Sequence, residues 1–125
     1  MKIIGGADGC RSGWVVCRRG VEGGPLDIRV VKTLAEACEG LSILAVDMPI
    51  GLMDTPVPGR ACEPEARALL PGKASSVFPT PCRPALAATT HAEANAISRA
   101  LGKGLNRQTF HLFPKMREID ALITP

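Results

Sequence analysis

Runs of apolar and other β-forming residues predict three strands in the first third of the chain. They cover residues 2–8, 14–19 and 26–31, which are rich in β-forming side chains. Five residues, with Gly9 and Gly13 at the two ends, separate the first two strands and favour an antiparallel hairpin. The third run largely alternates with a period of two, as expected for a half-exposed strand at a sheet edge.

Leu41–Val46 predicts a fourth strand of a different kind. Thr33 and Glu36 have the spacing of a capping box, so a short helix should precede this strand and end at Gly40. The apolar run that follows is nearly continuous, which is typical of a strand covered on both faces and parallel to its neighbour. The predicted order is therefore β-β-β-α-β, which indicates an α/β fold.

The composition changes between residues 53 and 84, where seven of the eleven prolines lie. Proline lacks a backbone donor, so a long regular element is excluded there. One short helix is predicted from Pro64 to Leu70. The loop that follows, 73–84, has a length typical of functional or disordered segments.

Helices are predicted again after residue 90. Thr90 and Glu93 form a second capping box at the start of one helix. Asn106 can cap a further helix, which should kink or restart at Pro114, and a last helix is predicted over 115–123.

Composition indicates a folded chain. At 125 residues it is predicted to form a single domain, 1–125. Apolar residues make up 46% and the mean hydropathy is +0.13, which excludes a disordered chain. These residues are spread out and no signal peptide is recognisable, so we expect no membrane span and a cytoplasmic location. The five cysteines lack zinc-ligand spacing and are expected to be reduced.

The net charge of +3 comes entirely from the second part of the chain. Residues 1–51 carry six basic and six acidic side chains, whereas residues 52–125 carry nine and six. This excess is compatible with a nucleic acid or nucleotide as partner, but it is weaker than the basic footprint of typical nucleic-acid-binding domains. Solvated surface charges are the alternative interpretation.

Asp8 and Asp47 are the main candidate functional residues, because each comes at the end of a predicted strand. If the fourth strand lies parallel to the first and beside it, both carboxylates leave the sheet at the same edge. Carboxylates on rigid elements are the ligands that Mg²⁺ or Mn²⁺ requires, with positions left for water and phosphate. Alternatively, Asp8 caps the turn at residues 9–11 and Asp47 caps the loop before Pro49.

Other charged residues could complete such a site. Glu63, Glu118 and Asp120 are further carboxylates, and helix-surface ion pairs explain each of them equally well. Arginine and lysine side chains can bind phosphate, although solvation at the surface explains any one of them. These basic candidates are Arg60, Arg67, Lys73, Arg83, Arg107, Lys115 and Arg117.

Two other enzyme classes lack their signatures. Ser75 and Ser76 have no elbow glycines, and no histidine base can be assigned to them from spacing. Gly5, Gly6 and Gly9 form neither a dinucleotide-binding loop nor a Walker loop.

Several stretches together resemble a known family. They are Asp8–Trp14, Asp47–Leu52, Arg60–Arg67, Ser75–Arg83, Gly104–Leu105 with Gln108, and Pro114–Asp120. In this order, over the whole chain, the sequence is similar to domain-of-unknown-function family 429, whose members are described as predicted nucleases of the ribonuclease H-like fold. The resemblance implies a mixed sheet in the order β-β-β-α-β-α-β, with Asp8 and Asp47 on its first and fourth strands.

The resemblance also implies an activity, that of a metal-dependent nuclease or phosphodiesterase. Asp8 and Asp47 are then expected to bind Mg or Mn as catalytic residues, with Glu118 and Asp120 as further catalytic carboxylates. Five basic residues are expected to bind the substrate: Arg60, Arg67, Arg83, Lys115 and Arg117. A non-catalytic binding module, an inactive fragment of the same fold and a phosphoryl-transfer enzyme for small nucleotides are the alternatives.

Similar members of the family continue beyond the point where this sequence ends. The resemblance therefore leads us to expect an incomplete domain without its last strand. The strand at residues 41–46 would then have an unpaired edge, which is a template for another chain. We expect a homodimer through this edge, or coverage of the edge by the loop at residues 53–58.

Overall fold

The computed structural model describes residues 1–123 and divides into two compact units. Met1–Met48, together with residues 121–123, forms the sheet unit, and Pro49–Asp120 forms the helical unit. The single domain expected from chain length stays a prediction.

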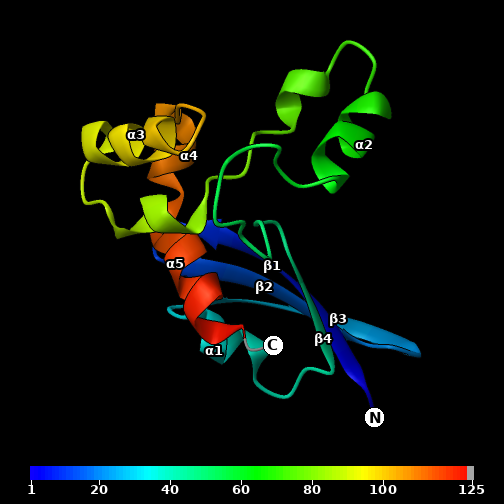
Figure 1. Ribbon diagram of the computed structural model, residues 1–125. Helices are drawn as coiled ribbons and strands as arrows, with labels where there is room; N and C mark the ends of the chain where they lie inside the picture. The colour runs from blue at the N-terminus through cyan, green and yellow to red at the C-terminus, as the bar shows by residue number, and fades with distance from the viewer. Residues whose placement is uncertain (124–125) are drawn as a thin grey trace. The chain divides into compact units, whose positions relative to one another are not determined.

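The sheet unit contains four strands and one helix. Its elements are β1 (Ile3–Cys10), β2 (Gly13–Gly20), β3 (Gly23–Val31), α1 (Leu34–Cys38) and β4 (Ile43–Val46). The sheet has the order β3-β2-β1-β4, antiparallel between β1, β2 and β3 and parallel between β1 and β4 (Figure 1). The predicted α/β class, the order β-β-β-α-β and the place of β3 at an edge are confirmed.

The hairpin between β1 and β2 is tighter than predicted. β1 continues to Cys10, so Asp8 lies inside the strand, opposite Val15, and the five-residue connection was wrong. Gly13 belongs to β2 and has φ +142°, and a Cβ there would meet the carbonyl oxygen of Val31 at 2.1 Å. Gly13 is therefore required for close packing within the sheet, whereas the sequence suggested a flexible turn residue.

One face of the sheet carries the core of the sheet unit. Trp14 and Val16 point to the same face because they are two residues apart in β2, and both are fully buried. Ala7, the register partner of Val16, is buried as well. α1 packs against β2 and β3 and contributes the buried residues Leu34 and Ala37.

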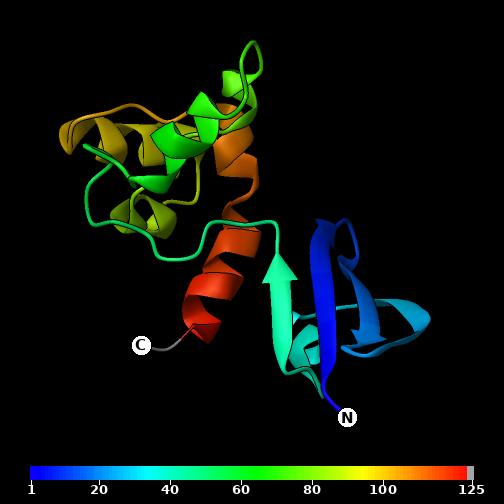
Figure 2. The ribbon, with the colours of Figure 1, turned by 90° about the vertical axis from the view of Figure 1, so that its right-hand side faces the viewer.

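The opposite face of the sheet is exposed and apolar. The register places Val15, Val30 and Ile43 on this face, and 37%, 58% and 65% of these side chains are exposed. The expectation that residues 41–46 are covered on both faces is therefore wrong. The apolar run reflects the pairing of β4 with β1 at a sheet edge, which Figure 2 shows.

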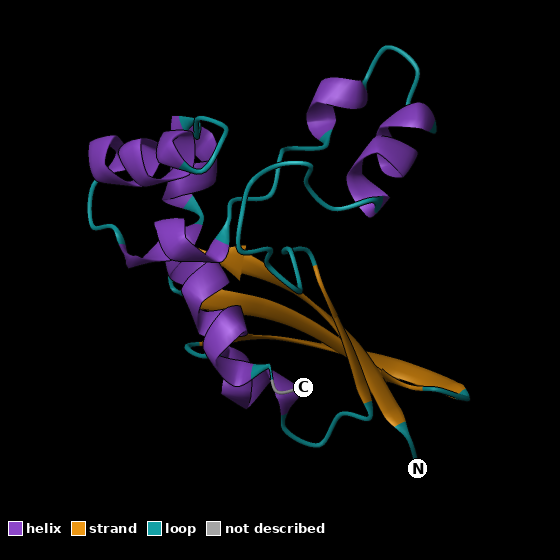
Figure 3. Cartoon of the chain, in the orientation of Figure 1, coloured by secondary structure: helices purple, strands orange, loops and turns teal. Residues whose placement is uncertain are grey.

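Short helices and loops make up residues 49–120, and no strand occurs in this range (Figure 3). The helical elements are α2 (Cys62–Ala68), η1 (Ala74–Ser76), η2 (Arg83–Ala87), α3 (His91–Ala100), α4 (Arg107–His111) and α5 (Phe113–Leu122), the last of which ends beyond this unit. Over residues 1–123, no helix is both long and apolar enough to cross a bilayer.

Local sequence signals explain where the helices begin. The side chains of Thr33, Thr90 and Asn106 each accept a hydrogen bond from a backbone N–H three residues later, so these three predicted N-caps are confirmed. Pro114 is the second residue of α5, where its missing N–H costs nothing. The predicted break at this proline is therefore confirmed as a restart at Phe113.

The two faces of β2 and β3 give a direct test of this architecture. Val16→Ala should lower the free energy of unfolding by about 2 kcal/mol, because it removes two methyl groups from a closed core. Val30→Ala removes the same atoms from the exposed face and should change it by less than about 0.5 kcal/mol. Urea unfolding followed by circular dichroism measures both, and equal losses would show that the core face is misassigned.

Candidate functional site

The register of β1 and β4 brings Asp8 and Asp47 together. Ala7 of β1 pairs with Val46 of β4, and the N–H of Asp47 donates to the carbonyl oxygen of Ala7 at 3.4 Å. Asp8 and Asp47 are the next residues of two parallel strands, and such strands lie about 4.8 Å apart. The two aspartates are therefore neighbours at one end of the pairing, as the sequence predicted.

Both carboxylates line the same depression in the surface of the sheet unit. It has a volume of about 650 Å³ and is open to solvent, and Gly6, Val15 and Ala45 contribute to its lining. Two acidic groups thus stand at the margin of an otherwise largely apolar surface. A ligand could reach them without any movement of the chain.

Neither aspartate acts as a turn cap. Among residues 1–123, no hydrogen bond or ion pair involves the carboxylate of Asp8 or Asp47. Asp8 is paired inside β1, so the amides of residues 9–11 do not converge on its side chain. The capping interpretation is therefore wrong, and both groups have their lone pairs available for a ligand.

Two neighbouring anions without a partner favour a cation. Like charges side by side on a sheet are destabilising, and a divalent ion with oxygen ligands would offset this repulsion. The donor set of Asp8 and Asp47 fits Mg²⁺ or Mn²⁺, which commonly bind one or two carboxylates and keep several waters. Within the part of the chain that the structure describes, however, no three His, Cys, Asp or Glu side chains are gathered to hold a metal.

Glu118 and Asp120 lie on α5 in the helical unit. The carboxylate of Asp120 accepts two hydrogen bonds from Arg83, at 3.0 and 3.1 Å. This hydrogen bonding and the charge of Asp120 raise the pKa of the Arg83 guanidinium, with a smaller contribution from Asp54. Asp120 is therefore engaged in an ion pair, and a catalytic role for it or for Glu118 stays a prediction.

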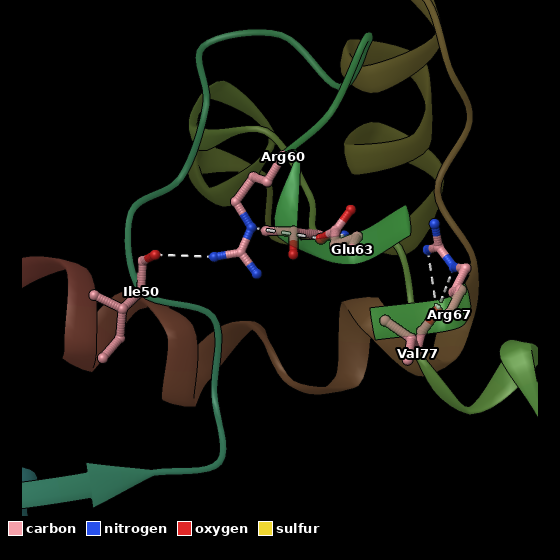
Figure 4. Close-up of polar contacts among 6 residues, drawn as sticks. Ile50, Arg60, Glu63, Arg67 and Val77 are labelled. Atoms are coloured by element: carbon pink, nitrogen blue, oxygen red, sulfur yellow. Dashed lines mark hydrogen bonds and ion pairs between the residues drawn. The ribbon is translucent and has the colours of Figure 1, made fainter. Parts of the chain in front are cut away.

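Two of the basic candidates, Arg60 and Arg67, have structural partners of their own (Figure 4). Arg60 donates to the carbonyl oxygen of Ile50 at 2.9 Å, and Arg67 donates twice to that of Val77, at 3.1 and 3.2 Å. These side chains connect α2 to the chain before and after it. The interpretation of Arg60 and Arg67 as merely solvated residues is therefore wrong.

Arg117 on α5 has the same kind of role. Its guanidinium donates to the carbonyl oxygens of Leu86 at 2.7 Å and Ala88 at 2.6 Å, and it lies 5.7 Å from the ring centre of Phe113. It therefore ties α5 to η2. Lys115, on the same helix, is half-buried, and phosphate binding by these residues stays a prediction.

Glu63 is the residue whose position the sequence did not reveal. It is only 8% exposed, and its Oε1 accepts a hydrogen bond from the N–H of Thr80 at 2.9 Å. The same oxygen lies 3.5 Å from Nε of Arg60, close enough for an ion pair but not aligned for a hydrogen bond. The i,i+3 spacing indicated this ion pair, but no local pattern indicated that Thr80 and its neighbours cover the carboxylate.

Comparison with known proteins identifies the family. Residues 6–125 match the family described as "Protein of unknown function (DUF429)". The chain belongs to this family. No curated protein and no solved structure matches it. The DUF429 description names no activity, so the function has to be argued from the residues.

The repulsion between Asp8 and Asp47 can be measured. In metal-free buffer, Asp8→Asn should raise the free energy of unfolding by about 0.5 kcal/mol, because it removes one of two adjacent like charges. Glu22→Gln removes a carboxylate from the exposed turn between β2 and β3 and serves as the control. Urea unfolding in the presence of EDTA gives both free energies. If Asp8→Asn changes the free energy of unfolding by the same amount as Glu22→Gln, or lowers it, the two aspartates do not repel each other.

Proposed function

We propose that this DUF429 chain is a metal-dependent phosphodiesterase or nuclease with a ribonuclease H-like sheet. The observation that carries the proposal is the placement of Asp8 in β1 and of Asp47 directly after β4, each one residue beyond the register pair Ala7–Val46 of these parallel strands. The strand order β3-β2-β1-β4 and the resemblance noted above support the same fold. The substrate class is a nucleic acid or a nucleotide.

The residues of the sheet unit would hold the ion through two carboxylates. When bound, Mg²⁺ or Mn²⁺ supplies electrostatic stabilisation of the charge on phosphate oxygens. Asp8 and Asp47 orient the ion because both are fixed by the backbone pairing of rigid strands.

Metal binding tests the proposal directly. Titration calorimetry with Mg²⁺ and Mn²⁺ should detect binding to the wild type, and Asp47→Asn should weaken it at least about tenfold, because one of two protein ligands loses its charge. Glu22→Gln should bind as the wild type does. If Asp47→Asn and the wild type give the same titration, the metal site is disproved.

Hydrolysis assays separate the activities. The wild type with Mn²⁺ is incubated with single-stranded DNA, single-stranded RNA and a small phosphodiester nucleotide, and Asp47→Asn serves as the inactive control. Cleavage that depends on Asp47 supports a nuclease or phosphodiesterase. Metal binding without cleavage of any substrate supports the second candidate below.

The second candidate is a non-catalytic module that assembles with a copy of itself. Two observations favour it: only two carboxylates converge in the described chain, and β4 has no strand on its outer side among residues 1–123. An edge strand can pair antiparallel with the same strand of a second copy about a twofold axis. Such pairing would also continue the exposed apolar face across two sheets.

Self-association through β4 predicts a specific mutational pattern. Ile43→Lys should convert a dimer to a monomer, because a charged residue on an edge strand opposes pairing. Ile28→Lys places the same charge on β3, at the opposite edge and with similar exposure, and should leave the dimer intact. Size-exclusion chromatography with light scattering measures both, and a wild type that is monomeric at its highest soluble concentration disproves the interface.

A further inference from the structure

The helical unit contains a cavity that the proposed metal site does not use. It has a volume of about 220 Å³ and is more enclosed than the depression beside Asp8. Its walls come from the loop at residues 56–59, from α2, from residues 79–81 and from residues 103–106. Much of the lining consists of proline rings: Pro56, Pro58, Pro64, Pro79 and Pro81.

Glu63 places a carboxylate in the wall of this cavity. The side chain is more than nine-tenths buried, and only Oε1 has a recorded hydrogen bond, from Thr80, among the described residues. Oε2 lies close to Gly59: a Cβ added to this glycine would be 3.8 Å from Oε2, which is an ordinary contact distance. Gly59 has no side chain and also lines the cavity, so Oε2 retains acceptor capacity toward this space.

Oε2 is accessible and can accept a hydrogen bond, because among the described residues Nε of Arg60 is the one fully buried side-chain N or O atom without a hydrogen-bond partner. A carboxylate that is removed from water is costly unless hydrogen bonds compensate it, and Thr80 and Arg60 compensate mainly Oε1. A ligand with N–H groups would satisfy Oε2 at no cost to the existing contacts. The proline rings beside this carboxylate offer apolar surface against which a ligand ring can pack.

The volume limits the ligand to a small ring system. About 220 Å³ corresponds to roughly seven water molecules of about 30 Å³ each, which is the scale of one heterocyclic base and below that of a drug-sized ligand. The exposed residue Lys103 lies at the cavity, and no ion pair is recorded for its ammonium group in the described part of the chain. A phosphate attached to the ring system could bind there.

We propose that this cavity binds a nucleobase with adjacent N–H donors, specifically guanine in a guanine nucleotide. Guanine presents two neighbouring N–H groups at its Watson–Crick edge, and both can converge on the single available oxygen Oε2, whereas adenine presents an acceptor beside its amino group and repels Oε2. Bases outside a duplex are read in this way, by edge hydrogen bonds and by apolar side chains that sandwich the ring. The site lies within the helical unit and needs no metal, so it stands independently of the proposed function.

The test uses nucleotide binding to the full chain in EDTA, which removes any contribution from a metal site. Isothermal titration should show that GMP binds and that AMP binds at least about tenfold more weakly than GMP. Glu63→Gln should abolish this preference, because the amide can accept from Thr80 but then presents N–H donors to the cavity. Glu65→Gln, on the same helix but exposed, is the matched control and should retain it.

A second measurement does not depend on the fold of a variant. In ¹H–¹⁵N spectra of the wild type, GMP should shift the amide signals of Gly59, Thr80 and Leu105 around the cavity. Absence of GMP binding, equal affinity for GMP and AMP, or shifts confined to other parts of the chain would each disprove the site. Loss of metal binding in Asp47→Asn has no bearing on these outcomes.

Discussion

Backbone hydrogen bonds between β1 and β4 determine where the negative charge of the sheet unit lies. The two strands run parallel and in register through Ala7 and Val46, so Asp8 and Asp47 follow at adjacent positions. Neither carboxylate has a protein partner among the described residues. The candidate metal site is thus a consequence of strand pairing, and the proposed function depends on that pairing.

Arginine side chains have a different function in the helical unit. Proline lacks a backbone N–H, so a proline-rich segment has more carbonyl groups than donors with which to pair them. Guanidinium groups supply the missing donors to the carbonyl oxygens of Ile50, Val77, Leu86 and Ala88. Charge-assisted hydrogen bonds therefore act beside the apolar core in holding together residues 49–120, where no strand occurs. For Arg60, Arg67 and Arg117, the positive charge that suggested a phosphate-bearing partner therefore has a structural role.

Glu63 connects this structural role with binding. Its carboxylate fastens α2 to Thr80 and pairs with Arg60, and these contacts leave one oxygen directed toward a cavity. That oxygen favours a ligand with a hydrogen-bond donor, because a carboxylate oxygen can only accept. The two candidate sites differ in kind: two exposed carboxylates in the sheet unit, and one available acceptor oxygen beside a cavity in the helical unit.

Local patterns in the sequence determined the elements. Capping residues such as Thr33 and Thr90, the break at Pro114 and the order β-β-β-α-β depend on contacts between residues close in the chain, and all are confirmed. The position of Asp47 beside Asp8 could also be anticipated, since chain order restricts how a fourth strand can join the sheet.

Only the tertiary structure decided which surfaces are buried. The apolar run at residues 41–46 gave no sign that Ile43 would be exposed, and the hairpin pattern did not show that Asp8 lies inside β1. The burial of Glu63 depends on Thr80, which is far along the chain and has no periodic relation to it. The sequence by itself determined local hydrogen bonding and strand order, whereas burial and acceptor availability depend on long-range packing that no local pattern encodes.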